Sequence, residues 1–412
     1  MQQYALQYYQ NSYFPNSTRN ISDGEQSVCS QNTSSQEYKD QQLVQSVTSE
    51  LSIYWSLAQN IPAIFLSIIY GSLSDRYGRK LIIIISLLGT GVKAGLCALG
   101  IFLNLNIYIS IVFFGVEGFT GTWISSLMAL FAYGADITKP GNNRTVIILL
   151  LETFLGVGAV IGMLVSGYLI KYLGFSYANV IASGFVAVGV LITLIFLPES
   201  VHVSEETKKT KIDFSYLNTS FKFYTVKNFS KYGKRWQYLV CLSIFVLIVT
   251  ANLGKATVES LYVLNSPFCW NSVTLGWFGA LRSGLLAVTA AAIVKPLQFC
   301  FRDENIIIIG ALSYIASCIL EAFTTNNIVM FMVPVVGALT NIQTPVIRSM
   351  MSKMTSPDVQ GALFAGIAAL ESVCNLTSSV ISSGIYAETV SIFRGLVFLV
   401  MAGLNLLAAL LV

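Results

Sequence analysis

Long apolar segments, separated by short polar turns, make up most of this chain. The first two, Leu51–Tyr70 and Leu81–Phe102, are long enough for a helix rising ~1.5 Å per residue to cross ~30 Å of hydrocarbon. We predict further spanning helices over residues 107–133, 145–170, 175–197, 237–264, 272–294, 305–323, 328–349, 359–384 and 392–412. The pattern therefore predicts an all-α membrane protein with eleven spans in this sequence.

Composition supports this interpretation and excludes several functions. Of the 412 residues, 54% are hydrophobic and 11% are charged, which is more apolar surface than one soluble core can bury. The sequence has no C-x-x-C pair, a single histidine (His202) and no nucleotide-binding loop. No nucleophile, base and orienting group can be assembled from the residues at membrane depth. We therefore expect no metal site, no nucleic-acid partner and no enzymatic activity.

The basic residues orient the chain in the membrane. The turn between the first two spans, residues 71–80, holds Arg76, Arg79 and Lys80, and the positive-inside rule places such a turn in the cytoplasm. With that orientation, most of the 24 Lys and Arg residues lie on the cytoplasmic side. The basic residues on the outer side are Arg19, Lys39, Lys171 and Arg394. The same topology therefore accounts for loops along the whole chain.

The spans divide into two halves around a basic polar segment. We expect an outer polar segment over residues 1–50, a helical bundle over 51–198, a cytoplasmic linker over 199–236 and a second bundle over 237–412. Five spans precede the linker and six follow it, whereas transporter folds of this kind pair two six-helix halves. We therefore expect the first helix to be missing.

The first 50 residues are expected to face an oxidising compartment. They contain three N-x-[S/T] glycosylation sequons, at Asn16, Asn20 and Asn32, together with Cys29. Cys29 and Cys269 are the two cysteines that this topology places outside, so we pair them in a disulfide. We expect a glycosylated outer face on which this bridge ties the two halves together.

Two motifs resemble those of a known superfamily. The turn Gly71-Ser72-Leu73-Ser74-Asp75-Arg76-Tyr77-Gly78-Arg79-Lys80 matches the pattern G-x-L-x-D-R-x-G-R-K, which lies between the second and third helices of the major facilitator superfamily. Leu197-Pro198-Glu199-Ser200 resembles its P-E-S motif at the end of helix six. The resemblance implies a major facilitator fold of two six-helix bundles. It also implies a gating role for the turn residues Gly71, Asp75, Arg76, Gly78, Arg79 and Lys80.

Other segments resemble one family within that superfamily. Residues 344–349, 352–353 and 360–364 are similar to the helix ten to eleven region of the proton-coupled folate transporter family. Similarity to the family's helices four and five is found at residues 131–136, 144–145 and 151–152. Similarity to its loop after helix seven is found at residues 267–270. The resemblance runs from about Cys29 to the end of the chain. It implies a proton-coupled carrier of folates or of other organic anions and conjugates.

Charged residues inside the spans are the candidate functional groups, because each is costly in hydrocarbon and usually faces a bundle interior. They are Lys93, Glu117, Glu152, Lys255, Glu259, Arg282, Glu321 and Glu371. By the resemblance, Glu152, Arg282 and Glu371 lie on helices that line the central cavity, so we favour them for transport. Lys255 and Glu259 are four residues apart and could form an i,i+4 ion pair. For Lys93 we favour an internal counter-ion or snorkelling, and we discount Glu321 because it lies near an outer helix end.

The resemblance also assigns roles to individual residues. Glu152 matches a glutamate that the family links to proton coupling, with Glu371 as our next candidate for that role. Arg348 matches an arginine linked to proton and substrate binding, and Arg282 joins it as a candidate substrate ligand. Cys29 and Cys269 match the family's bridge between outer loops.

Two departures from the family's pattern concern the substrate. Asn252 stands where the folate carrier has a histidine of helix seven, and Thr122 stands where it has an aspartate of helix four. Both positions are candidate substrate-binding residues. We therefore expect a substrate other than folate.

These observations predict a secondary active transporter that moves an organic anion or conjugate together with protons by alternating access. A proton-independent facilitator and a non-transporting membrane receptor on the same fold stay open as alternatives. We expect an integral, multi-pass protein of the plasma membrane or of an endolysosomal membrane. Its expected partners are the lipid bilayer and a small-molecule organic anion. The proton is the expected coupling ion, with no other cofactor.

Overall fold

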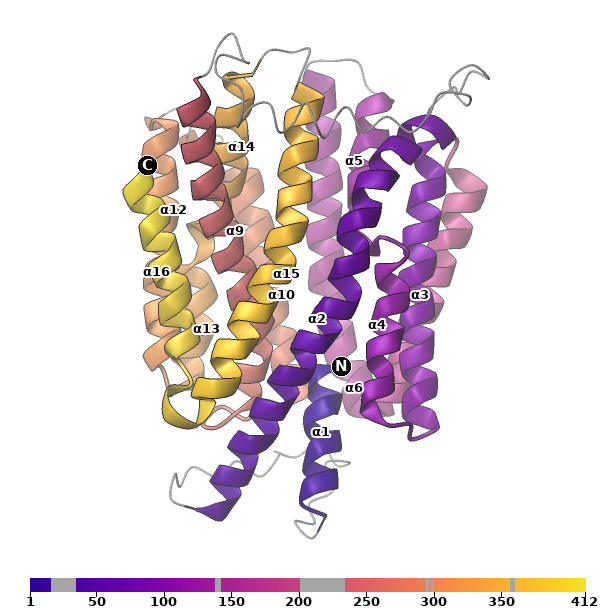
Figure 1. Ribbon diagram of the computed structural model, residues 1–412, viewed down its shortest axis with the longest axis vertical. Coiled ribbons are helices and arrows are strands. Elements are labelled where there is room, and N and C mark those ends of the chain that lie inside the picture. Colours follow the sequence, from indigo (N-terminus) through magenta and orange to yellow (C-terminus); the bar gives the residue numbers. More distant parts are fainter. Residues whose placement is uncertain (16–34, 138–141, 201–233, 294–295, 298–299, 356–359) are drawn as a thin grey trace.

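The computed structural model describes residues 1–15, 35–137, 142–200, 234–293, 296–297, 300–355 and 360–412 (Figure 1). The helices are α1 (Gln2–Tyr13), α2 (Gln36–Tyr77), α3 (Arg79–Phe102), α4 (Ser110–Gly118), α5 (Thr122–Asp136), α6 (Asn142–Phe196), α9 (Arg235–Leu264), α10 (Ser272–Ala292), α12 (Asp303–Phe323), α13 (Asn327–Val336), α14 (Gln343–Lys353), α15 (Gln360–Phe393) and α16 (Leu396–Leu411), with two short 3-10 helices, η2 (Ile107–Ile109) and η3 (Ala338–Ile342). These described residues contain no β-strand, and the expected all-α class is confirmed.

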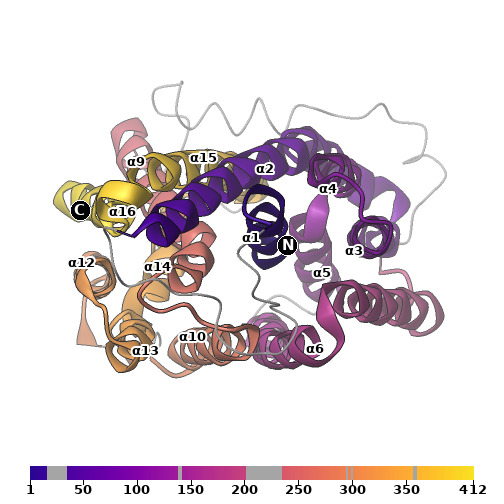
Figure 2. The ribbon, with the colours of Figure 1, turned by 90° about the horizontal axis from the view of Figure 1, so that it is seen from below.

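The helices form two bundles that stand side by side (Figures 1 and 2). Helices α2 to α6 make the first bundle, and α9 to α16 make the second. The bundles meet where α2 packs against α15 and where α6 packs against α10. Glycines permit the second contact, because a Cβ atom on Gly167 would lie 2.6 Å from the carbonyl oxygen of Ser272. The two-bundle architecture implied by the motifs is therefore present.

Two ends of the molecule are distinguished below. The basic end holds the α2–α3 turn with Arg79 and Lys80, and the Cys269 end holds the loop between α9 and α10. Figure 1 shows α2 and α15 running close together from the middle of the molecule toward the Cys269 end and lying farther apart at the basic end. The bundles are therefore joined more closely at the Cys269 end.

The segment expected as a polar loop over residues 1–50 contains helix α1 and the first part of α2. Helix α1 lies between the two bundles (Figure 2). Its Ala5 and Tyr9 side chains are buried in a cluster with Val44, Leu51 and Trp55 of α2. The segment is polar on average, so the sequence did not indicate the one apolar face of α1 that packs along α2. The sequons at Asn16, Asn20 and Asn32 lie outside the described residues.

The expected number of eleven spans is not confirmed. Six of the described helical segments are long and apolar enough to cross a membrane, namely Arg79–Phe102, Ile107–Gly134, Thr153–Phe196, Arg235–Leu264, Asp303–Phe323 and Asn327–Lys353. The spans expected over 145–170 and 175–197 correspond to two helical parts of α6, which are joined at Gly174 with the non-helical angles φ 78° and ψ 177°. A glycine at this point permits the positive φ that separates the two parts.

One span in each bundle is interrupted. In the first bundle the break between α4 and α5 contains Gly121, with φ 86°, and is followed by Thr122, with φ 61°. In the second bundle α13 ends at Val336 and is separated from α14 by Gly337 and η3. Interrupted helices in corresponding places of two halves are typical of transporter binding regions.

Candidate functional site

The basic turn is fastened to other parts of the first bundle. Gly78 adopts φ 105°, and the backbone N–H of Arg79 donates to Glu199 Oε1 at 2.8 Å. The Arg79 Nε atom lies 3.0 Å from Asp136 Oδ2 at the end of α5. Lys80 donates to the carbonyl oxygen of Leu194 at 2.9 Å. The turn and the P-E-S segment, two motifs far apart in sequence, therefore form one contact region.

Three members of the expected gating motif cannot be placed by side-chain contacts. Gly71, Asp75 and Arg76 belong to α2, but their side chains lie outside the described part of the structure. The gating role of Asp75 therefore stays a prediction. Glycine is required at Gly78, where a Cβ atom would lie 2.1 Å from Glu199 Oε2 and the backbone has positive φ.

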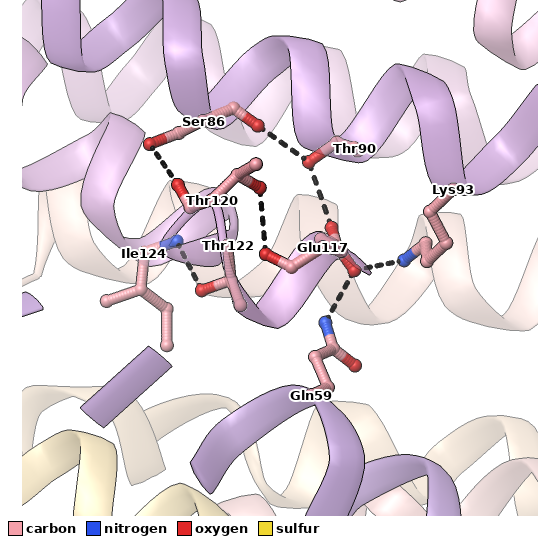
Figure 3. Close-up of polar contacts among 8 residues, drawn as sticks. All are labelled: Gln59, Ser86, Thr90, Lys93, Glu117, Thr120, Thr122 and Ile124. Atoms are coloured by element: carbon pink, nitrogen blue, oxygen red, sulfur yellow. Dashed lines mark hydrogen bonds and ion pairs between the residues drawn. The ribbon is translucent and has the colours of Figure 1, made fainter. Parts of the chain in front are cut away.

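A buried ion pair lies beside the break in the first bundle (Figure 3). The Glu117 side chain, on the last turn of α4, is only 1% exposed. Its Oε2 atom accepts hydrogen bonds from Lys93 Nζ at 2.5 Å and from Gln59 Nε2 at 2.7 Å. Its Oε1 atom accepts from Thr90 Oγ1 at 2.9 Å. An internal counter-ion, one of the two explanations favoured for Lys93, is therefore present, and three helices are joined at one carboxylate.

Thr122, a candidate substrate ligand, lies close to this network but does not face an open surface. It is buried at the start of α5, where its Oγ1 accepts a 3.4 Å hydrogen bond from the backbone N–H of Ile124. Asn252 lies in the other bundle, half-buried on α9 and three residues before Lys255. The two positions that depart from the folate carrier therefore lie in different bundles.

The ion pairs of the second bundle differ from the expected i,i+4 pair. Lys255 Nζ lies 2.8 Å from Glu321 Oε2 on α12, and Arg282 of α10 pairs with Glu259. Both residues of α9 thus use partners on other helices rather than each other. Glu321, which we discounted as lying near water, is 0% exposed and belongs to this group. We call Lys255, Glu259, Arg282 and Glu321 the charged tetrad.

A further ion pair of the second bundle is partly open to solvent. Arg348, on α14 just beyond the break in its span, donates from Nη2 to Glu371 Oε2 on α15. The two side chains are 36% and 38% exposed. The Nε atom of Arg348 has no hydrogen-bond partner within the described structure, and its guanidinium lies 5.6 Å from the centre of the Phe245 ring. Glu371 uses one Nη2 donor, so the partly exposed guanidinium offers its other terminal N–H donors to an anion, whereas the Nε atom is buried.

The charges of these pairs balance one to one. Four basic side chains within the helices, Lys93, Lys255, Arg282 and Arg348, each pair with a different carboxylate. Such pairing lowers the cost of charge in a low-dielectric interior. Glu152, on α6, is not part of this balance, because its side chain lies outside the described structure. The site residues Arg348 and Glu371 are thus together, while a contact of either with Glu152 stays a prediction.

Polar contacts between the bundles lie at the Cys269 end and near the middle of the molecule. Gln42 and Asn265, both buried, exchange two side-chain hydrogen bonds of 3.2 and 3.1 Å. Ser49 donates to the carbonyl oxygen of Ser383 at 2.8 Å, and Asn375 donates to Asn60 at 3.1 Å. Sequence reasoning missed these residues, although amides within otherwise apolar helices could have indicated them. Together they describe a conformation that is closed at the Cys269 end.

The expected disulfide is not tested by these contacts, because Cys29 lies outside the described residues. Cys269 is buried and lies beside Gln41 of α2, whose Nε2 is 3.8 Å from the sulfur atom. Five cysteines are free thiols, namely Cys97, Cys241, Cys300, Cys318 and Cys374. The pairing of Cys29 with Cys269 stays a prediction.

Comparison with known proteins defines the family. A family model described as Major Facilitator Superfamily matches residues 42–294. The chain is 33% identical over 387 residues to the lysosomal proton-coupled steroid conjugate and bile acid symporter SLC46A3 of Rattus norvegicus, covering 93% of this chain and 83% of that protein. It is 29% identical over 370 residues to the proton-coupled folate transporter of Rattus norvegicus, covering 90% and 79% respectively.

Solved structures agree at the level of the fold. The human organic anion transporter MFSD10 aligns with a TM-score of 0.62 and 15% identity over 100% of this chain and 89% of that one. A peptide transporter POT aligns with a TM-score of 0.64 and 13% identity over 99% and 90%. The chain is therefore a membrane transporter of the Major Facilitator Superfamily, and not an enzyme. Within that superfamily it belongs to the proton-coupled folate transporter-like family of solute carriers.

Proposed function

We propose that this transporter moves organic anions together with protons, by alternating access, across the plasma membrane or an endolysosomal membrane. The observation that carries the proposal is the one-to-one pairing of basic and acidic side chains within the helices. An anion that entered this balanced interior alone would add an uncompensated charge in a low-dielectric region. A proton that enters with the anion removes that cost.

The exchange is proposed to take place at Arg348 and Glu371. The anionic group of the substrate binds the guanidinium of Arg348, using its terminal N–H donors and displacing Glu371. The displaced carboxylate then binds a proton, which keeps the site neutral. Substrate and proton favour each other's binding, as symport requires. Arg282, which is 31% exposed and paired with Glu259, is a second proposed ligand of the same type.

Glu152 is retained as a proposed proton-coupling residue of the first bundle. Its support is the match to the family's helix-five glutamate and its place in α6. Because α6 is mostly apolar, a carboxylate within it is partly desolvated, and desolvation favours the protonated form. Glu152 and Glu371 thus offer one proton-binding group in each bundle.

The substrate is proposed to be an amphiphilic organic anion or conjugate. Relatives are named as a symporter of steroid conjugates and bile acids and as a folate transporter. The departures at Asn252 and Thr122 favour the first type of substrate over folate. The expected disulfide and sequons further suggest that the Cys269 end faces the outer or lumenal compartment.

The basic turn is proposed to act in gating. Its contacts to Asp136 and Glu199 hold the α2–α3 junction to the ends of α5 and α6. Asp75 is proposed to favour the outward-open state by binding a helix N-terminus or a basic partner. Asp75→Asn should slow transport at equal surface abundance, and unchanged turnover would remove this role.

Uptake by reconstituted protein tests the proposal. Vesicles that contain the protein are given a labelled steroid sulfate, bile acid or folate, with the outer solution at pH 5.5 or at the inner pH. We expect concentrative uptake of a steroid sulfate or bile acid at the acidic outer pH, and loss of accumulation when a protonophore collapses the gradient. Uptake that ignores the gradient would favour the proton-independent facilitator, and no uptake of any anion would favour the receptor.

A further inference from the structure

Glu321 is the most deeply buried carboxylate of the charged tetrad. It lies two positions before the end of α12 and is 0% exposed. Its Oε2 atom contacts Lys255 Nζ at 2.8 Å without the angles of a hydrogen bond, and its Oε1 atom has no hydrogen-bond partner in the described structure. The ammonium of Lys255 is also shared with Ser317, at 3.1 Å. A fully buried carboxylate is therefore only partly compensated.

Glu117 offers a comparison within the same molecule. It is equally buried and also has one lysine partner, but its two oxygen atoms accept hydrogen bonds from Lys93, Gln59 and Thr90. Hydrogen bonds to a carboxylate favour its ionised form. Both oxygens of Glu117 are thus engaged, whereas the free oxygen of Glu321 can take a proton without breaking any hydrogen bond.

None of the other described groups around Glu321 donates a hydrogen bond to its free Oε1 atom. The charged neighbours are Lys255 of α9 and Arg282 of α10, and Arg282 is itself paired with Glu259. Tyr262 of α9 uses its hydroxyl to donate to the backbone oxygen of Glu321 at 2.8 Å, leaving the carboxylate free. Arg394 lies against the Tyr262 ring. Tyr314 and Cys318 lie on the same helix as Glu321, and Lys255 stands 5.6 Å from the centre of the Tyr314 ring.

We propose that Glu321 is a further proton-binding site of the transport cycle. After Glu321 loses its proton, the carboxylate pairs again with the ammonium group of Lys255. The inference rests on the proposed function and adds one proton to the number that is coupled to substrate transport. In the step, a proton binds Oε1 of the Glu321 carboxylate and Lys255 keeps its own proton. The charged tetrad then changes from neutral to a single positive charge. No covalent bond other than the new O–H is formed.

The position of Glu321 fits a proton that is carried across rather than merely bound. The residue lies at the Cys269 end of α12, where the bundles are closed by contacts such as Gln42 with Asn265. Separation of the bundles there would move α9, which meets α2 and carries the Lys255 partner of Glu321, and is proposed to open a path to the carboxylate from that side. In the described conformation Glu321 is sealed and paired with Lys255, the state expected after proton release. Alternating access to one carboxylate is the requirement for proton coupling.

The number of coupled protons gives the first test. With membrane potential held at zero, each coupled proton contributes about a tenfold accumulation of substrate per unit of pH difference. Glu321→Gln, which imitates the protonated acid, should therefore lower the limiting accumulation ratio about tenfold across one pH unit. Glu388→Gln, at an exposed position outside these ion pairs, is the control and should leave the ratio unchanged. The double variant Lys255→Gln/Glu321→Gln has no unpaired charge, so it keeps the tetrad neutral and should also lose the factor of ten.

An unchanged ratio in either Glu321 variant would overturn the inference while leaving the proposed function intact. If the unmodified protein itself accumulates no anion along a pH gradient, the proposed function fails instead.

Labelling of the unmodified protein gives a second test that does not depend on folding of a variant. Hydrophobic carbodiimides react with protonated carboxyl groups, and peptide mass spectrometry locates the product. We expect Glu321 to be modified, or joined to Lys255 with loss of water, in a yield that rises as the pH falls. Glu117 in the same digest should stay unmodified. Equal labelling of both residues, or no reaction of Glu321 at any pH, would overturn the inference.

Discussion

Replacement of Glu371 by glutamine separates substrate binding from proton coupling at the proposed site. Glutamine has the shape of the protonated acid and cannot take up a further proton. Arg348 and Glu371 are more than a third exposed, and ion pairs of this kind stabilise a protein by only about 0–1 kcal/mol. Glu371→Gln should therefore leave the amount of folded protein in the membrane nearly unchanged.

The free energy of the Arg348–Glu371 ion pair, about 0–1 kcal/mol, also limits the expected change in substrate affinity. In the parent protein an anionic substrate must displace Glu371 from Arg348 before it binds. Removing a competitor that contributes up to about 1 kcal/mol should tighten substrate binding at neutral pH by up to about fivefold. The affinity should also become less dependent on pH, because the group that responds to pH at this site is gone.

Two uptake assays on the same vesicles distinguish the steps. Exchange of labelled for unlabelled substrate at equal pH should persist in Glu371→Gln, whereas accumulation along a pH gradient should fall. Glu388→Gln, on the same helix but outside the ion pairs described above, serves as the control. If Glu371→Gln still concentrates substrate as strongly as the parent protein, Glu371 is not a coupling group and Glu152 becomes the principal candidate.

Three further predictions follow from individual contacts. Gly78→Ala should lower thermal stability, by about 1–3 kcal/mol, because φ is 105° and the new Cβ would meet a carboxylate 2.1 Å away; Gly184→Ala, with nothing within 4 Å, is the control in the same melting experiment. Gln42→Ala removes two of the hydrogen bonds of the buried Asn265 amide, which keeps those to Ser266 and Tyr386, and should favour opening at the Cys269 end. The measurement is the alkylation rate of a cysteine introduced there, which should rise; equal rates would exclude a closing role. Mass spectrometry of unreduced peptides should find Cys29 linked to Cys269, and two free thiols in protein kept from reductant would disprove the bridge.

The class of protein could be predicted from the sequence because it depends on local properties. Long apolar segments and the turn that ends at Lys80 are visible in the chain without knowledge of any contact. The division between the spans expected over 145–170 and 175–197 could also be predicted, because it falls at Gly174, where glycine permits a positive φ. The helix α1 was missed because its apolar face is short and lies among polar residues.

The partners of charged residues could not be predicted from spacing. Lys255 and Glu259 are correctly spaced for an i,i+4 pair, yet each finds an oppositely charged partner on another helix. The choice between a local and a distant partner depends on how α9 is rotated against α10 and α12, which is a property of the packed bundle. For the same reason Glu321 was taken as close to water, although neighbouring helices cover it completely.

The most direct test of the central claim is simultaneous measurement of anion and proton movement by the purified protein in sealed vesicles. A saturating amount of the transported anion is added outside, with equal pH on both sides and with membrane potential held at zero. We expect the anion to carry protons inward, so that a trapped dye reports acidification of the lumen at a fixed ratio to substrate influx. Anion influx with no change of lumenal pH beyond that of protein-free vesicles would contradict it.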